Sequence, residues 1–324
     1  MKEPPFINRE IELKVLLNYA KKGYYPVLYL YGPEGCGKTR LLKEVVKRLQ
    51  NRKDYLIVYI DAQSTSSIEN SLLAPSEIVR VMADIIGNLT EPIGKLLAYA
   101  VVKLSQKLSR RQVRDKRVVI LIDDVARPLG LDVIEVYAKN LLKLIEELYS
   151  LGVESVFVLA TTSEGISRRL LARHNYTRLR ELWNLSPQST QELLKALEAP
   201  PSISNRLYSL TGGNPRSIIE LWRKNWKVKT WIQEIEFNLK PFLEDLPRDL
   251  KEKLVKVIED IDLVLEDLTL RDRLLEANLI APIDRPCLGY TPEVNKELGI
   301  GEYYAWQIPV YKQVLCKLLS NDRN

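Results

Sequence analysis

The chain has 324 residues, 46% of them hydrophobic, which is enough apolar side chain for the cores of about two or three domains. Its 48 Lys and Arg residues exceed its 42 Asp and Glu residues, and the resulting charge of +6 permits a nucleic-acid partner without requiring one. Three scattered cysteines exclude a disulfide framework, and the longest apolar run, residues 96–102, is far shorter than a membrane span. We therefore expect a cytoplasmic protein without a membrane partner.

Apolar runs alternate with amphipathic segments over the first 185 residues. Residues 27–31, 55–60, 118–122 and 156–160 are short apolar runs, typical of strands that are buried on both faces of a parallel sheet. Between the second and third of these runs, residues 93–108 place apolar side chains on one helical face. The pattern predicts an α/β fold in which a parallel sheet is covered by helices.

The segment 32–39, Gly-Pro-Glu-Gly-Cys-Gly-Lys-Thr, fits the pattern GxxxxGK[ST] of a phosphate-binding loop, or Walker A motif. It follows a predicted strand and precedes a predicted helix, so its backbone N–H groups and the helix N-terminus can bind phosphate. We expect Lys38 to contact the β- and γ-phosphates and to contribute to catalysis, and Thr39 to bind Mg²⁺. The expected phosphate-binding residues are Pro33, Glu34, Gly35, Cys36, Gly37, Lys38, Thr39 and Arg40.

Two acidic residues, Asp123 and Asp124, follow the apolar run 118–122. The carboxyl ends of the strands are the edge at which open α/β sheets bind ligands. The arrangement matches a Walker B motif, in which Asp123 would hold Mg²⁺ through water and Asp124 would orient or deprotonate the attacking water.

Beyond residue 185 the pattern becomes helical. Ser-Pro at 186–187 opens one predicted helix, and Gly-Gly-Asn-Pro at 212–215 separates two more. Further helices reach residue 278, after which 279–283 and 303–308 are read as two strands of a β-wing before a last helix. We expect a P-loop ATPase core at 1–185, a helical lid at 186–239 and a winged-helix domain at 240–324.

The chain resembles the archaeal-type P-loop ATPases of the STAND branch of the AAA+ superfamily. Phe-Ile-Asn-Arg-Glu at 6–10 is similar to the entry motif of that family, and Thr-Gly-Gly-Asn-Pro at 211–215 is similar to its lid motif. The resemblance implies that ATP or ADP is the ligand, with Mg²⁺ as cofactor. It also implies that Ile7, Arg9 and Pro215 lie near the adenine base.

The same resemblance suggests where the γ-phosphate is sensed. Many members have an arginine at the position of Ser163, so sensing is expected to fall to Thr162, or to Arg168 or Arg169 just beyond it. The winged-helix histidine of some relatives is missing, because the single histidine lies at 174. Arg216 is expected to act as a lid arginine that reaches the phosphates.

A regulatory ATPase that switches conformation with its nucleotide is the function we expect, acting on a protein partner or through self-association. A DNA-binding ATPase resembling archaeal replication initiators is the alternative, and a small-molecule kinase is a second rival. Arg271 and Arg273 in the predicted recognition helix are offset by neighbouring acidic residues, so we do not favour nucleic-acid binding by the segment 240–324.

Two further features leave two interpretations open. Seven basic residues between 103 and 117 form a run with a single acid, which is typical of a solvated helix end but could also follow a phosphate backbone. Three tryptophans between 222 and 231 are interleaved with cations, and they indicate packing more strongly than base stacking.

Overall fold

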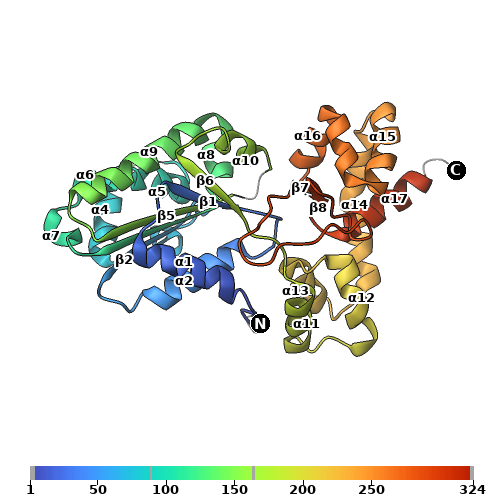
Figure 1. Ribbon diagram of the computed structural model, residues 1–324, viewed down its shortest axis with the longest axis horizontal. Helices are drawn as coiled ribbons and strands as arrows, with labels where there is room; N and C mark the ends of the chain where they lie inside the picture. Colours follow the sequence, from blue (N-terminus) through green and yellow to red (C-terminus); the bar gives the residue numbers. More distant parts are fainter. Residues whose placement is uncertain (1–3, 88–89, 163–164, 322–324) are drawn as a thin grey trace. The chain divides into compact units, whose positions relative to one another are not determined.

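The computed structural model in Figure 1 describes residues 4–87, 90–162 and 165–321. The chain divides into two compact units. The first, here called the α/β unit, comprises Arg9–Tyr31 and Lys38–Arg180. The second, here called the helical unit, comprises the segment that precedes Arg9, the short segment Gly32–Gly37 and everything from Glu181 onward. The chain therefore passes between the units several times.

The α/β unit contains most of the strands. In chain order its elements are α1 (Glu10–Lys22), β1 (Val27–Tyr31), α2 (Lys38–Leu49), β2 (Tyr55–Asp61), α3 (Ile68–Ser71), β3 (Leu72–Leu73), α4 (Ser76–Ile86), α5 (Ile93–Val101), α6 (Leu104–Lys107), α7 (Arg110–Val113), β4 (Arg117–Asp123), α8 (Ala126–Leu129), α9 (Leu131–Ser150), β5 (Ser155–Thr161), α10 (Gly165–Leu171) and β6 (Thr177–Glu181), whose last residue belongs to the helical unit.

The strands form one sheet in the order β3-β2-β4-β5-β1-β6. The pairs β2 and β4, β4 and β5, and β5 and β1 are parallel, and β3 is antiparallel to β2. All four strands that the apolar runs predict are present, so the predicted α/β fold with a mostly parallel sheet is confirmed. Strand β5 lies between β1, which leads into the phosphate loop, and β4, which ends in the acidic pair.

Helices cover both faces of the sheet. In Figure 1, α1 and α2 lie on one side of it, and α5, α6 and α9 lie on the other. Side chains of β2, β4 and β5 such as Val58, Ile120 and Val158 share a core with Leu97 of α5 and Leu141 of α9. Burial on both faces explains why these strands are apolar at nearly every position.

Three details of this unit differ from the sequence prediction. The helix expected over 93–108 is broken into α5 and α6, because the N–H of Lys103 bonds to the carbonyl of Ala100 in a tighter turn. Strand β6 was not predicted: it lies at an edge of the sheet, its two arginines are exposed and the leucine between them is half-buried. Strand β3 has only two residues, too few to leave a periodic pattern.

The helical unit follows β6. Its elements are α11 (Pro187–Ala196), α12 (Pro201–Thr211), α13 (Pro215–Arg223), α14 (Val228–Glu244), α15 (Arg248–Glu259), the 3₁₀ helix η1 (Ile261–Glu266), α16 (Leu268–Glu276), β7 (Ile280–Pro282), β8 (Tyr304–Trp306) and α17 (Pro309–Asn321).

Helix α14 runs through the expected boundary between residues 239 and 240. One apolar core contains Leu194 and Leu207 from the expected lid together with Leu254, Leu274 and Leu315 from the expected winged helix. The segments expected as two domains therefore share both a helix and a core. The expected division at 185 also differs from the structure, in which the helical unit begins at Glu181 and includes Gly32–Gly37.

The two strands expected as a β-wing are present, since β7 and β8 pair in antiparallel fashion. Of the three tryptophans, Trp231 is buried and donates its indole N–H to Glu220 at 3.1 Å, while Trp222 and Trp226 pack partly buried against the core of the helical unit. These contacts match the packing interpretation. Among the residues that the structure describes, no helix combines the length and the apolar character needed to cross a bilayer.

Candidate phosphate-binding site

The phosphate loop joins β1 to α2. Helix α2 begins at Lys38, so Thr39 lies in its first turn. Gly35 and Gly37 have φ angles of +80° and +104°, a region that residues with a β-carbon rarely adopt. Apart from its two chain neighbours, no atom of the described residues would lie within 4 Å of a β-carbon added to Gly37, so the loop has open space there. Lys38 is 8% exposed, whereas the Thr39 side chain is exposed.

Glu34, at the tip of the loop, has three polar contacts within the helical unit. Its backbone N–H donates to Oε1 of Gln307 at 2.7 Å, and its carbonyl accepts from Nδ2 of Asn214 at 2.8 Å. Its carboxylate forms an ion pair with Nη1 of Arg216 at 2.6 Å. The neighbouring Gly35 carbonyl accepts the Arg216 N–H at 3.3 Å. The loop is thus fastened through both its backbone and its side chain.

The amides that fasten the loop are themselves held in place. Asn214 caps α13 by accepting the N–H of Ser217 at 3.1 Å, and its Nδ2 also donates to Oδ1 of Asn184 at 2.9 Å. Asn184 in turn donates to the Gln307 carbonyl at 3.0 Å. Asn184, Asn214 and Gln307 are all at most 4% exposed. A buried polar network of this kind has one favoured geometry, because each lost contact leaves a buried polar group unpaired.

The acidic pair lies in the α/β unit at the end of β4. Asp123 is 4% exposed, and its two carboxylate oxygens accept hydrogen bonds from the hydroxyls of Thr161 at 2.7 Å and Tyr59 at 3.1 Å. Burial, and then the charge of Asp123, raise the pKa of Tyr59 well above its ordinary value, so this hydroxyl keeps its proton and remains a donor. Two donated hydrogen bonds thus fix the orientation of the Asp123 side chain.

Asp124 follows in a left-handed backbone conformation with φ at +51°. Its N–H donates to Oγ1 of Thr161 at 2.8 Å, and its carboxylate accepts from the side-chain amide of Gln63. The side chain is only partly buried. The turn therefore directs the two neighbouring carboxylates into different environments, one enclosed and one open to water.

Thr161 contacts both acidic residues, yet the sequence prediction overlooked it in favour of Thr162. It is the last residue of β5, and its register partner on β1 is Leu30. On the other side of β5, Ala160 pairs with Ile122 of β4. Successive side chains of a strand point to opposite faces of the sheet, so Thr161 and Thr162 point to opposite sides. This alternation was the signal that could have identified Thr161.

The expected sensors have varied surroundings. The hydroxyl of Thr162 is buried 2.7 Å from that of Ser167, and its N–H bonds to the Leu30 carbonyl. The Arg168 guanidinium lies 5.1 Å from the ring centre of Tyr31, the last residue of β1, while Arg169 is half-buried on α10. Ser163 lies outside the described residues. Sensing by Thr162, Arg168 or Arg169 stays a prediction, as does the role of Arg216.

The residues expected near adenine are distributed over both units. Ile7 packs against the core of the helical unit, and Pro215 is the first residue of α13. Arg9, in the α/β unit, is 6% exposed, has a φ of +75° and forms an ion pair with Glu12 at 2.8 Å. Their contact with a base also stays a prediction.

The residues present suit a nucleotide and a magnesium ion. The Thr39 hydroxyl and the carboxylate of Asp123 are the hard oxygen donors that Mg²⁺ prefers, and Mg²⁺ commonly keeps several waters. The open space at Gly37 leaves its backbone free to approach a phosphate. Thr39 and Asp123 would hold the ion, whose charge would stabilise charge that develops on the phosphates.

Residues 6–221 match the model of a family described as an ATPase domain predominantly from Archaea. The chain belongs to this archaeal ATPase family. The match confirms the archaeal-type P-loop ATPase that the sequence motifs indicate, and it spans the phosphate loop, the acidic pair and the turn at Asn214.

Relatives of this archaeal ATPase include uncharacterized ATP-binding proteins of Methanocaldococcus jannaschii. One is 36% identical over 56 residues, 17% of this chain and 16% of the relative, and another is 20% identical over an alignment that covers 85% of this chain and 89% of the relative. A third is 37% identical over 54 residues, again 16% of its own length. The relatives with 36% and 37% identity are therefore matched over much less than two thirds of their own length.

Two solved structures are similar over nearly the whole chain. Cdc6p from Pyrobaculum aerophilum has 15% identity and a TM-score of 0.44, with 99% of this chain and 98% of that chain covered. A STAND protein with a tetratricopeptide repeat sensor from Pyrococcus horikoshii has 16% identity and a TM-score of 0.40, with 98% of this chain and 43% of that chain covered. Both TM-scores lie below 0.5, so the functions of these proteins are not transferred to this chain.

Proposed function

We propose that this archaeal ATPase is a Mg²⁺-dependent, nucleotide-driven switch of the STAND type that acts on a protein partner or on a second copy of itself. The observation that carries the proposal is the set of contacts around Glu34. Its N–H, carbonyl and carboxylate are each bonded to a residue of the helical unit, namely Gln307, Asn214 and Arg216. Because the loop is bonded to these residues, the binding of a nucleotide in the loop is coupled to the position of α13 and of the segment after β8.

The two acidic residues support hydrolysis rather than simple binding. Asp123 is enclosed and suits the metal role, and Asp124 is open to water and suits the role of base or orienting group. ATP and ADP differ by the γ-phosphate, so only contacts that sense this group can bias one conformation over another. We assign this sensing to Arg216, whose present partner Glu34 lies in the phosphate loop itself.

The three cysteines, Cys36, Cys287 and Cys316, are all free thiols, in keeping with the reducing cytoplasm that we propose as the location. The winged-helix character of the segment from α15 to α17 is likewise part of the proposal.

The switch is tested by loosening the loop. Replacing Gln307 by Leu keeps the bulk of the side chain but removes the acceptor for the Glu34 N–H. If this bond restrains the loop, we expect Q307L to release and exchange bound ADP at least about fivefold faster than wild type, because one buried hydrogen bond contributes about 1 kcal/mol. The measurement is the dissociation rate of a fluorescent ADP analogue by stopped flow.

Gln313 provides the matched control, since it is also a glutamine of the C-terminal segment but donates to the Ser209 carbonyl of α12 at 3.0 Å rather than contacting the loop. Q313L should exchange nucleotide at the wild-type rate. Equal rates in Q307L and wild type would contradict the restraint, and equal acceleration in Q313L would indicate general loosening instead.

The replication-initiator alternative predicts duplex binding by α16, whose charges are largely neutralised. Arg271 is mostly buried and forms an ion pair with Asp272 at 3.1 Å, and nearby Lys253 pairs with Asp267 at 2.5 Å. We therefore expect R271E/R273E to leave the affinity for duplex DNA unchanged within a factor of about two, because Arg271 is already paired and the exposed Arg273 lies between the acidic Asp272 and Glu276 in the sequence. The full chain serves for this titration, since a cut at residue 240 would divide α14. A steep loss of affinity would favour the initiator role.

A further inference from the structure

Positive charge is concentrated in one of the two units. Counted over the full sequence, the residues of the α/β unit include 28 Lys and Arg against 18 Asp and Glu, a net charge of +10. Those of the helical unit include 20 basic and 24 acidic residues, a net charge of −4. The net charge of +6 for the whole chain is therefore the sum of a strongly basic α/β unit and a weakly acidic helical unit.

Part of this charge surrounds a cleft formed by α1, the end of α2 and the start of β2. The cleft has a volume of about 760 Å³. Its basic residues are Lys14, Lys21, Arg48 and Arg52, no acidic residue lines it, and its remaining wall includes Leu17, Leu49, Tyr19 and Tyr55. Lys14 and Lys21 are exposed, and the described residues offer neither of them an ion-pair partner. These two ammonium groups are available to an anionic ligand.

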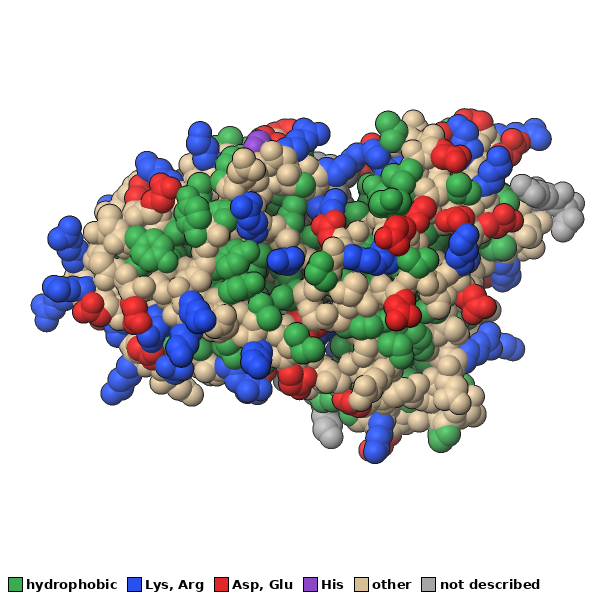
Figure 2. All heavy atoms as spheres, in the orientation of Figure 1, with side chains coloured by type: hydrophobic (Ala, Val, Ile, Leu, Met, Phe, Trp, Pro, Cys, Tyr) green, Lys and Arg blue, Asp and Glu red, His purple; other side chains and the backbone are tan. Residues whose placement is uncertain are grey.

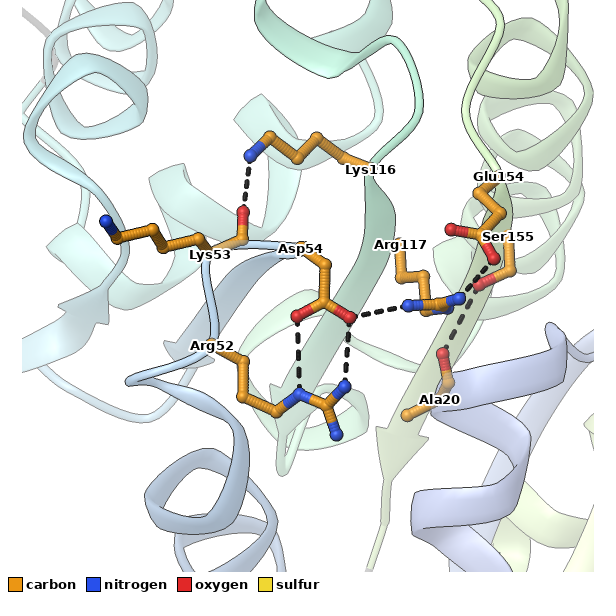
Figure 3. A network of polar contacts seen from close by, with 8 residues as sticks. All are labelled: Ala20, Arg52, Lys53, Asp54, Lys116, Arg117, Glu154 and Ser155. Atoms are coloured by element: carbon orange, nitrogen blue, oxygen red, sulfur yellow. Dashed lines mark hydrogen bonds and ion pairs between the residues drawn. The ribbon is translucent and has the colours of Figure 1, made fainter.

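Figure 3 shows a network of charged residues at the amino ends of the strands, which includes Arg52 of the cleft and the carboxylates Asp54 and Glu154. Arg52 and Arg117 both bond to Asp54, Arg52 through Nη2 at 3.0 Å and Arg117 through Nη1 at 2.5 Å. Arg52 also lies over the ring of Tyr55 at 4.9 Å. Lys116 donates to the carbonyl of Lys53. These contacts bring residues from the starts of β2 and β4 side by side.

The basic run between 103 and 117 lies at the far end of this surface. Arg110, Arg111 and Arg114, on and directly after α7, are exposed and lead into Lys116 at the start of β4. Figure 2 shows basic side chains gathered over this end of the molecule, with acidic ones fewer. The cleft and the run, far apart in the sequence, thus belong to one surface. We call it the basic edge.

We propose that the basic edge binds the phosphate backbone of a nucleic-acid strand. Cations lie in the cleft and also beyond it, so the ligand is a long, repeating polyanion rather than a single phosphate or a short acidic peptide that ends in the cleft. The half-buried side chains of Leu17 and Tyr19 in the cleft wall suit sugars and bases of a single strand. The edge lies at the amino ends of the strands, opposite the phosphate loop, and is independent of the proposed switch.

Charge reversal at each end of the basic edge tests the proposal in the full-length protein. The probes are a fluorescein-labelled single strand and its duplex, titrated by anisotropy over a range of salt concentrations. We expect K14E/K21E and R110E/R111E each to weaken single-strand binding at least about tenfold. Two lost phosphate contacts should also make the slope of log K against log salt shallower by about 1.4.

Lys139 of α9 and Arg173, after α10, are exposed cations outside the basic edge and provide the matched control. K139E/R173E changes the net charge equally and should bind the strand as wild type does, and all variants should retain wild-type ATP affinity. An equal loss in this control would overturn the proposal, as would polyglutamate of matched charge binding as tightly as the strand. Preference for the duplex would replace the single strand as ligand and overturn the role of the cleft wall.

Discussion

Replacing Lys38 by Ala should weaken ATP binding by about 100-fold or more. Lys38 is the first residue of α2, directly follows Gly37 of the loop and is 8% exposed, so its side chain is largely withdrawn from water. A buried charged contact to two phosphate groups contributes several times the ~1.4 kcal/mol that corresponds to a tenfold change in affinity. Isothermal titration calorimetry with ATP and Mg²⁺ measures the difference directly.

Lys43 offers the comparison for this substitution, because it lies on the same helix with an exposed side chain. K43A removes one lysine from α2 without touching the loop and should bind ATP as wild type does. If K38A retained an affinity within about threefold of wild type, the assignment of residues 32–39 as the phosphate loop would be wrong.

Replacing Asp124 by Asn should slow hydrolysis by about 100-fold or more while leaving Mg-ATP binding intact. Asparagine tolerates the left-handed backbone at this position nearly as well as aspartate, so the turn and its bond to Thr161 are kept. The amide, unlike the carboxylate, cannot accept a proton from water. Phosphate release under single-turnover conditions, with ATP affinity measured in parallel, separates the two effects.

Asp123 is the internal comparison, because the same substitution has a different expected outcome there. An amide at this site would turn a donor toward the hydroxyls of Thr161 or Tyr59, and it would remove a charge from the metal site. D123N should therefore raise the Mg²⁺ concentration needed for half-maximal binding, an effect that D124N should not show. Identical defects in the two variants would refute the division of roles.

Much of the α/β unit could be predicted from the sequence because its strands are buried on both faces. Burial on both faces requires apolar side chains at every position, and such runs are conspicuous in β1, β2, β4 and β5. Edge strand β6 could not be predicted, since the exposed Arg178 and Arg180 interrupt the apolar pattern. The boundary expected between residues 239 and 240 differs from the structure because α14 continues through it, and the carbonyl of Pro241 within the helix still accepts the N–H of Asp245 at 3.0 Å.

The candidate site could be predicted only where the residues that form it are neighbours in the sequence. The phosphate loop and the acidic pair are contiguous motifs whose backbone and side chains act together. Gln307 bonds to Glu34 across 273 residues of sequence, and nothing around it in the chain marks it as a partner. Asn184 could not be predicted for the same reason, because its role depends on the fold, which brings Asn214 and Gln307 next to it.

The six residues Gly32–Gly37 have a consequence for how this protein can be divided. They belong to the helical unit, although the chain on both sides of them belongs to the α/β unit. A truncated protein that stops at residue 185 would keep the complete Walker motifs but would leave the N–H, carbonyl and carboxylate of Glu34 without their partners. Its loop would then sample conformations that the full chain excludes. A single crossover between two relatives that exchanges the chain from Glu181 onward would leave Gly32–Gly37 behind. The loop and its distant partners therefore have to vary together.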